Sequence, residues 1–385
     1  MASSDGNRIP ELDGLRGVAI GLVLLFHYFF WTLGPTPGSP LAYVLAVGRL
    51  TWTGVDLFFV LSGFLIGGIL LDARGSSNYF QVFYTRRFYR ILPLYAFWFC
   101  AVQLMVLAVR TGHVNMPEFL AERLPAFPYA VFLQNFWMAA YNTFGGITSG
   151  GTWSLAIEEQ FYLTIPIVIW FVDVRKKPSV ILAGILAAPI FRVLCFALFP
   201  EHQFTPFFLM PCRADALLCG VLGAILWRDA NWKARAQMNS RPLKLIMIIL
   251  LAGAAFFTLH NTPLYGWWMI SIGYTWMAAL YLTILLFALT QPESKLSSYL
   301  RSKWLMGLGT IAYGVYLSHQ YVRDAVAHIS WFAVSNKLVT ELIVSIIALP
   351  LTFMLCRLSY IYFEKPLIRL GHRSKYQNAG SVDKN

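Results

Sequence analysis

Ten runs of predominantly apolar residues, each about 17 to 22 residues long, dominate this sequence of 385 residues. A helix of about 17–25 apolar residues crosses the ~30 Å hydrocarbon core of a bilayer. Only 12% of the residues are charged, whereas soluble chains carry about 25%. The sequence therefore predicts an all-α polytopic membrane protein, with about ten transmembrane helices enclosing a central cavity, and it excludes an ordinary soluble fold.

The predicted spans cover residues of about 14–33, 54–71, 88–109, 152–171, 179–199, 211–227, 243–260, 268–289, 304–323 and 339–360. No small-residue cleavage site follows the first run, so we expect it to be retained as a span. The apolar stretch 129–141, within segment 124–141, is too short to cross, which predicts an interfacial or re-entrant piece. We expect one membrane domain over residues 1–366 and a basic tail over residues 367–385.

Lysine and arginine residues are divided unequally between the two ends of the predicted spans. If the N-terminus lies in the cytoplasm, 22 of the 30 basic residues lie on the cytoplasmic side and five on the other. Cytoplasmic loops of membrane proteins carry such an excess. The bias predicts a multi-pass protein of the cell (inner or cytoplasmic) membrane with both termini cytoplasmic. It also accounts for the net charge of +12 without a nucleic-acid partner.

Four ionisable residues lie inside predicted spans at a similar depth: His27, Asp56, Glu158 and His319. At 1.5 Å per residue, all four fall within roughly 10 Å of the outer surface. Ionisable groups inside a membrane are candidates for function, and a histidine with carboxylate neighbours has the composition of a general-base site. A ring of polar residues lining a vestibule explains the same layer equally well. Trp153 belongs to an interfacial aromatic belt or stacks on a sugar.

A second set of charges lies at the predicted cytoplasmic side. Arg16 precedes His27 by eleven residues, so the two share one face of a helix at roughly 16 Å. Arg86, Arg87 and Arg90 lie at the start of the third span. Guanidinium groups bind phosphates bidentately, which predicts a pocket for a phosphorylated ligand. Retention of the loop in the cytoplasm, or contact with anionic lipid headgroups, explains the same arginines.

Other polar or small residues within the spans have structural interpretations. Arg192 and the pair Arg213–Asp215 favour ion pairs inside the bundle, although they could also line an acceptor cavity. The small residues of Ser62-Gly63 and Gly67-Gly68 predict close approach of helices. The five scattered cysteines have neither a metal-binding nor a disulfide spacing, so we predict no metal site.

Six segments, taken in order, resemble the acyltransferase family 3 of integral membrane acyltransferases. They are residues 11–17 followed by His27, 54–66, 86–93, 152–163, 313–319 and 363–366. Arg16 and His27 are similar to the family's Arg-x10-His signature. The resemblance extends over nearly the whole chain, and six motifs in the right order are far more specific than any one of them.

The resemblance implies an enzyme, an O-acyltransferase that moves an acyl group, usually acetyl, from cytoplasmic acyl-CoA to a hydroxyl of a glycan, antibiotic or lipid. It implies that His27 is the essential histidine and that Arg16, Arg86, Arg87 and Arg90 hold the CoA phosphates. Acyl-CoA is then a co-substrate, and no permanently bound cofactor or metal is expected. Some members carry a secreted esterase-like domain after the membrane part. None follows here, which implies direct transfer to a carbohydrate or glycolipid acceptor, or a separate partner protein.

We expect His27, oriented by Asp56 or Glu158, to remove the proton from an acceptor hydroxyl that arrives from the outer side. Alternatively, His27 first takes the acyl group itself as a covalent intermediate. The rival function is a proton-coupled transporter, because buried histidines and carboxylates also form proton relays. Further candidates for acceptor binding or support are Asp13, Trp153 and His319.

Overall fold

The computed structural model describes residues 9–31, 48, 50–114, 124–146, 150–173, 175–260, 263–329 and 336–377. These residues form helices and no strand. Eight helices among them are long and apolar enough to cross a membrane: Pro10–Phe30, Leu50–Ala73, Tyr79–Arg110, Lys177–Leu198, Thr205–Arg228, Arg241–Leu259, Met269–Thr290 and Leu338–Gly371. The predicted class, an all-α polytopic membrane protein, is confirmed. Residues 32–33 of the first predicted span and 378–385 of the predicted tail lie outside the described residues.

Two of the ten predicted spans are not among these eight helices. Residues 152–171 correspond to α7 (Trp153–Phe171), in which two glutamates and a glutamine lower the mean hydropathy. Residues 304–323 are divided between α15 (Lys303–Thr310) and α16 (Ala312–Ile329). These helices pack against other helices: α7 contacts α3 and α10, α15 contacts α1, and α16 contacts α17. Packing of this kind shields polar side chains from lipid.

Four helices form the centre of the bundle, and more than half of each of their spans is buried. They are α1 (Pro10–Leu25), α3 (Gly54–Ala73), α10 (Met210–Arg228) and α13 (Tyr274–Thr290). α3 contacts α1, α10 and α13. The sites described below are built mainly on these helices and on the helices next to them.

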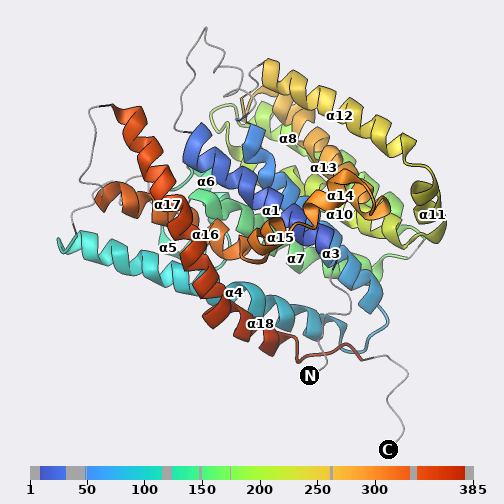
Figure 1. The fold of residues 1–385 in the computed structure, drawn as a ribbon, viewed down its shortest axis with the longest axis horizontal. Helices are drawn as coiled ribbons and strands as arrows, with labels where there is room; N and C mark the ends of the chain where they lie inside the picture. Colours follow the sequence, from blue (N-terminus) through green and yellow to red (C-terminus); the bar gives the residue numbers. More distant parts are fainter. Residues whose placement is uncertain are drawn as a thin grey trace, which may run out of the picture.

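Four other helices lie at the periphery, and less than a third of each of their spans is buried. They are α4 (Tyr79–Arg110), α8 (Lys177–Leu198), α12 (Arg241–Leu259) and α17 (Lys337–Ser359). In Figure 1, α4 and α17 lie on one side of the centre, and α8 and α12 lie on the other. Their exposed side chains include Leu182, Ile248 and Ile346. Outward apolar residues of this kind are expected on helices that face lipid.

Glycines allow the closest contact between two central helices. A Cβ atom at Gly63 of α3 would collide with the backbone of Leu217, and one at Gly220 of α10 would collide with the backbone of Val60. Only glycine permits two backbones to approach this closely. The prediction that Gly63 serves close helix packing is confirmed.

The apolar stretch 129–141 forms no spanning helix. It contributes to α5 (Ala126–Ala130) and α6 (Gln134–Ala140), between which Phe132 has a positive φ of 57°. The remaining short helices are η2 (Leu50–Thr53), η4 (Gly150–Thr152), α9 (Thr205–Phe208), α11 (Ala230–Met238), α14 (Lys295–Leu300) and α18 (Lys365–Gly371), together with the π-helical segments η1 (Phe26–Phe30), η5 (Met269–Gly273) and η6 (Tyr360–Glu364).

Candidate active site

His27 lies in η1, the π-helical turn that continues α1. The wider turn is closed by a hydrogen bond from the backbone N–H of Trp31 to the carbonyl of Phe26, at 2.8 Å. A π-turn contains one residue more than an α-turn, so it changes the direction in which the following side chains point, and such turns occur frequently at functional sites. The His27 side chain is half-buried at this position.

A second histidine lies against His27. Nε2 of His319, on α16, is 3.3 Å from Nδ1 of His27, and the two ring centroids are 4.9 Å apart. His319 is only 2% exposed. The phenol of Tyr28 donates to the carbonyl of His319 at 2.8 Å and lies 2.8 Å from the hydroxyl of Thr352 on α17. Helices α1, α16 and α17 thus meet around His27 and His319, which we call the histidine pair.

Asp56 lies elsewhere, which corrects the expectation that it orients His27. Its Oδ1 accepts a hydrogen bond of 2.6 Å from Nη2 of Arg213, and both side chains are almost completely buried. The guanidinium of Arg213 also lies over the ring of Tyr274, 3.9 Å from its centroid. Depth along a span does not determine which neighbour a side chain faces, and α3 turns Asp56 toward α10.

The other buried ion pair also differs from the predicted one. Nη1 of Arg192 donates to Oδ2 of Asp215 at 2.8 Å, and Nη2 of Arg192 donates to the hydroxyl of Thr275 at 2.7 Å. Asp215 therefore pairs with Arg192 rather than with Arg213. Trp153 is buried beside this region, with its ring centroid 4.3 Å from that of Phe207, which lies on α9. Because the Trp153 ring is buried against Phe207, it is not exposed for stacking on a sugar.

Three of the four arginines that the sequence groups together interact with one another, one on α1 and two on α4. The charges of Arg87 and Arg90 act on Arg16, and Nη1 of Arg16 pairs with Oδ1 of Asp13 at 2.8 Å. The guanidinium of Arg87 lies 5.7 Å from the ring centroid of Tyr162. We call Arg16, Arg87 and Arg90 the arginine cluster. Anions close by offset the repulsion between neighbouring positive charges, and they can be carboxylates of the protein, such as Asp13, or phosphates of a ligand.

Glu158 interacts with the arginine cluster and not with the histidine pair, which again corrects the expectation from depth. It interacts with the hydroxyls of Ser62 and Tyr162 and with the charges of Arg87 and Arg90. A hydrogen bond of 2.6 Å joins these two hydroxyl groups. In the described residues, the partner of His27 is therefore a histidine rather than a carboxylate.

Two further carboxylates near the cluster were not singled out from the sequence. Glu159 interacts with the charge of Arg87. Glu364, in η6, interacts with the charge of Arg90 and accepts a hydrogen bond of 3.1 Å from Ser359. Glu159 follows Glu158 inside an apolar run, and Glu364 lies in the motif over residues 363–366. These positions are visible in the sequence, but they do not reveal that the two glutamates interact with Arg87 and Arg90.

Arg86 binds a segment near the end of the described chain. Its Nε and Nη2 donate to the carbonyl of Ser374 at 3.0 and 2.7 Å, and its guanidinium lies 5.1 Å from the ring centroid of Tyr376. Asn78 donates to the carbonyl of Lys375 at 2.9 Å. Burial and the charges of the nearby arginines lower the pKa of His372. Arg86 therefore anchors the segment 374–377 to the start of α4.

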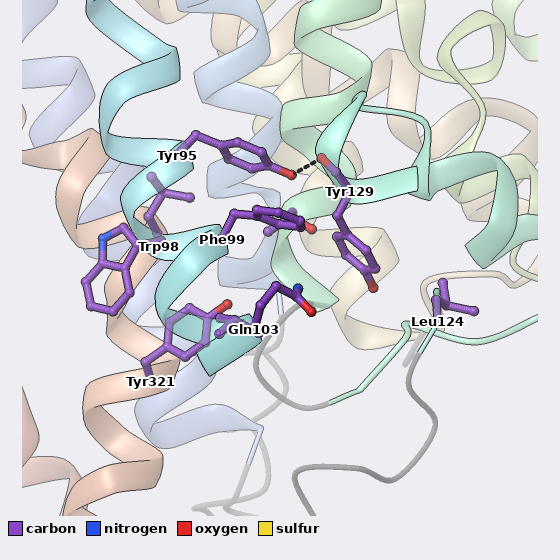
Figure 2. Close-up of a pocket in the computed structure, with 10 residues that line it drawn as sticks. Tyr95, Trp98, Phe99, Gln103, Leu124, Tyr129 and Tyr321 are labelled. Atoms are coloured by element: carbon purple, nitrogen blue, oxygen red, sulfur yellow. Dashed lines mark hydrogen bonds between the residues drawn. The ribbon is translucent and has the colours of Figure 1, made fainter. Parts of the chain in front are cut away.

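A pocket lies between α4, the segment before α7, and α16. It is lined by Tyr95, Trp98, Phe99, Val102, Gln103, Leu124, Tyr129, Thr152, Leu317 and Tyr321. Figure 2 shows Tyr95 pointing from α4 toward the backbone of Tyr129, to which its hydroxyl donates at 2.8 Å. The rings of Trp98 and Tyr321 stack with centroids 5.2 Å apart. On α16, Leu317 and Tyr321 each lie about 200° around the helix from His319, so the pocket and the histidine pair lie on different faces.

The described residues contain no group of three or more His, Cys, Asp or Glu side chains that could hold a metal ion. Their polar centres are the histidine pair, the arginine cluster with its glutamates, and the buried ion pairs Arg192–Asp215 and Arg213–Asp56. An imidazole in contact with a second imidazole can move a proton, and clustered guanidiniums can hold phosphates.

Comparison with known proteins establishes the family to which this chain belongs. A family model described as an acyltransferase domain matches residues 9–360, and the chain belongs to this family, acyltransferase family 3. The protein YrhL of Bacillus subtilis (strain 168) is 30% identical over 394 residues, covering 95% of this chain and 56% of YrhL.

Two relatives carry the name OatA. The peptidoglycan O-acetyltransferase OatA of Listeria monocytogenes serovar 1/2a is 27% identical, covering 98% of this chain and 58% of that protein. The O-acetyltransferase OatA of Staphylococcus aureus (strain NCTC 8325 / PS 47) is 26% identical, covering 95% and 58%. The chain spans somewhat more than half the length of these relatives. No solved structure matches it.

Proposed function

We propose that this protein is a membrane O-acyltransferase that moves an acetyl group from acetyl-CoA to a hydroxyl group of a cell-envelope glycan. Membership of the acyltransferase family supports the reaction class, and the names of the OatA relatives favour acetyl as the group and a glycan as the acceptor. The observation that carries the proposal is the histidine pair, which has an imidazole at a half-buried π-turn on the same helix as Arg16 of the arginine cluster.

The arginine cluster is the proposed binding site for the phosphates of acyl-CoA. Arg16 and His27 are eleven residues apart on one continuous helix, which corresponds to roughly 16 Å. A phosphate held at the cluster would allow the flexible arm of CoA to extend along α1 and bring its thioester to His27. The excess of basic residues at this end of the spans supports a cytoplasmic location for the cluster.

The chemistry that we propose at His27 is general-base catalysis. The imidazole removes the proton from the acceptor hydroxyl as its oxygen attacks the thioester carbonyl. The C–S bond then breaks, and the CoA thiolate takes the proton from the imidazolium, so that the products are the O-acetyl ester and CoA thiol. In the covalent alternative, His27 attacks the thioester first and the acceptor then attacks the acyl-histidine. Both routes need an unprotonated ring nitrogen on His27.

Substitution of His27 tests this proposal directly. His27→Ala should reduce acetyl transfer by about 10²–10⁴-fold, the typical contribution of general acid–base catalysis. The measurement is release of CoA thiol from acetyl-CoA by the purified protein, with the acceptor glycan present. The matched control is His260→Ala, because His260 is exposed at the end of α12. Near wild-type transfer by a folded His27→Ala protein contradicts the proposal, as does solute transport without consumption of acetyl-CoA.

A further inference from the structure

The protonation of His319 follows from its hydrogen bonds. Its Nδ1 lies 2.8 Å from the carbonyl oxygen of Tyr316 and 3.1 Å from that of Val315. Carbonyl oxygens only accept hydrogen bonds, so Nδ1 of His319 must carry a hydrogen. In a neutral imidazole, the other nitrogen then holds a lone pair. Nε2 of His319 is therefore a hydrogen-bond acceptor, and it faces His27.

The same reasoning applies to His27. Its Nδ1 lies 3.0 Å from the carbonyl oxygen of Val23 and 3.3 Å from Nε2 of His319. Both neighbours are acceptors, so Nδ1 of His27 must carry a hydrogen and its Nε2 must hold the lone pair. In the described part of the chain, no hydrogen-bond partner occupies this Nε2. The reverse tautomer would place a lone pair against two other lone pairs.

We propose that His319 is a positioning residue that holds His27 in the tautomer with hydrogen on Nδ1, so that Nε2 of His27 is the nitrogen that reacts. This inference deepens the proposed function and rests on it. When Nε2 takes a proton from the acceptor hydroxyl, the resulting imidazolium donates from Nδ1 to the imidazole of His319. A charged donor makes that hydrogen bond stronger than the neutral one before it. A neutral histidine thus takes the position that a carboxylate occupies in a serine–histidine–aspartate triad.

The fold holds His319 firmly enough for this role. Its backbone carbonyl accepts from Tyr28, whose side chain is completely buried. The carbonyl of Tyr28 in turn accepts from the hydroxyl of Ser345 on α17, at 2.6 Å. Tyr28 and His27 are adjacent in η1. The same π-helical turn therefore supplies both the reacting imidazole and the hydroxyl that holds the backbone of His319.

Two substitutions test whether His319 acts as a hydrogen-bond acceptor for His27 or serves only in packing. His319→Leu removes the acceptor, and kcat should fall about ten- to a hundredfold while the KM for acetyl-CoA stays unchanged, because one hydrogen bond to the imidazolium is lost. His319→Gln supplies an amide oxygen that can accept from Nδ1 of His27, and it should restore kcat to within about fivefold of the wild type. A residue needed only for packing would not be replaced better by glutamine than by leucine.

Nuclear magnetic resonance of ring-labelled histidine in the wild-type protein provides a readout without mutation at position 319. The His27 resonances, assigned by their loss in His27→Ala, should show hydrogen on Nδ1. Hydrogen on Nε2 would overturn the proposal, even if the His319 variants fail to fold. A folded His319→Leu protein with kcat within twofold of the wild type would also overturn it, as would a Gln variant as slow as the Leu variant. In these cases an inactive His27→Ala protein leaves the proposed function intact, whereas an active one removes the function itself.

Discussion

At the scale of single residues, three arginines that look alike in the sequence have different surroundings. Arg87 and Arg90 lie with Arg16 and with glutamates of α7 and η6. Arg86, one position before Arg87, donates instead to the carbonyl of Ser374. A step of one residue turns a side chain by about 100° around a helix, so neighbours in a basic run face different partners. Only part of the run is therefore suited to bind a ligand.

This difference predicts unequal effects of conservative substitutions. Arg90→Lys keeps the charge but loses the planar fork that binds a phosphate bidentately. The loss of one charge-assisted hydrogen bond, about 1.5–3 kcal/mol, should weaken acetyl-CoA binding roughly ten- to a hundredfold. Arg86→Lys should change affinity much less, because its partner is a backbone carbonyl of the protein. The measurement is the Kd for acetyl-CoA of each purified variant, and equal affinities for both variants and the wild type would exclude the cluster as the binding site.

At the scale of the helices, π-helical turns coincide with polar residues of the candidate site. Two of the three π-turns in the described residues hold residues of the polar centres, His27 in η1 and Glu364 in η6. Each of these two turns is continuous with a longer helix and changes the direction in which its side chains point. The apolar pattern of a span does not reveal such a turn, because the residues within the turn are themselves mostly aromatic or aliphatic.

Close packing of α3 on α10 gives a prediction about stability. Gly220→Ala should lower the free energy of unfolding by about 1–3 kcal/mol, because the added methyl group collides with the backbone of Val60. The control is Gly21→Ala in α1, where an added Cβ meets no atom within 4 Å. That change should be neutral or stabilising by up to ~1 kcal/mol, since alanine favours a helix more than glycine does. Thermal unfolding in detergent compares them, and equal Tm values would contradict the close contact.

At the scale of the whole molecule, buried ion pairs join central helices to one another and to the peripheral helix α8. Arg213–Asp56 links α10 to α3, while Arg192–Asp215 links α8 to α10 and reaches α13 through Thr275. All four charged side chains are nearly inaccessible. Buried charges are tolerated only when each has its partner, so these pairs favour one arrangement of the four helices over others.

Removal of one partner therefore tests whether Asp56 supports the fold or the reaction. Asp56→Ala leaves Arg213 as an uncompensated buried charge, which should lower the free energy of unfolding by about 3–5 kcal/mol. The protein that remains folded should keep a kcat close to that of the wild type, since Asp56 lies against Arg213 and not against the histidine pair. Thermal unfolding and acetyl transfer are measured on the same preparations. Unchanged stability with lost activity would return Asp56 to a role beside His27.

Much of the architecture follows from the sequence because the bilayer imposes a simple physical condition. Runs of about twenty apolar residues must become helices, since no other segment satisfies its backbone hydrogen bonds in lipid. Spacing along one helix is equally direct, so Arg16 and His27 could be placed on a common helix from their numbers alone. The family was also evident from the sequence, because its motifs occur in order along the chain.

Partners across helices were decided by the tertiary structure. Four residues at one predicted depth were expected together, yet His27 contacts His319 while Asp56 pairs with Arg213. Glu158 interacts with Arg87 and Arg90. Depth is a single coordinate, whereas a contact also depends on the rotation of each helix and on which helices are neighbours. Those two quantities come from close packing of glycines and aromatic rings and from pairing of buried charges, and these contacts join residues that lie far apart in the sequence.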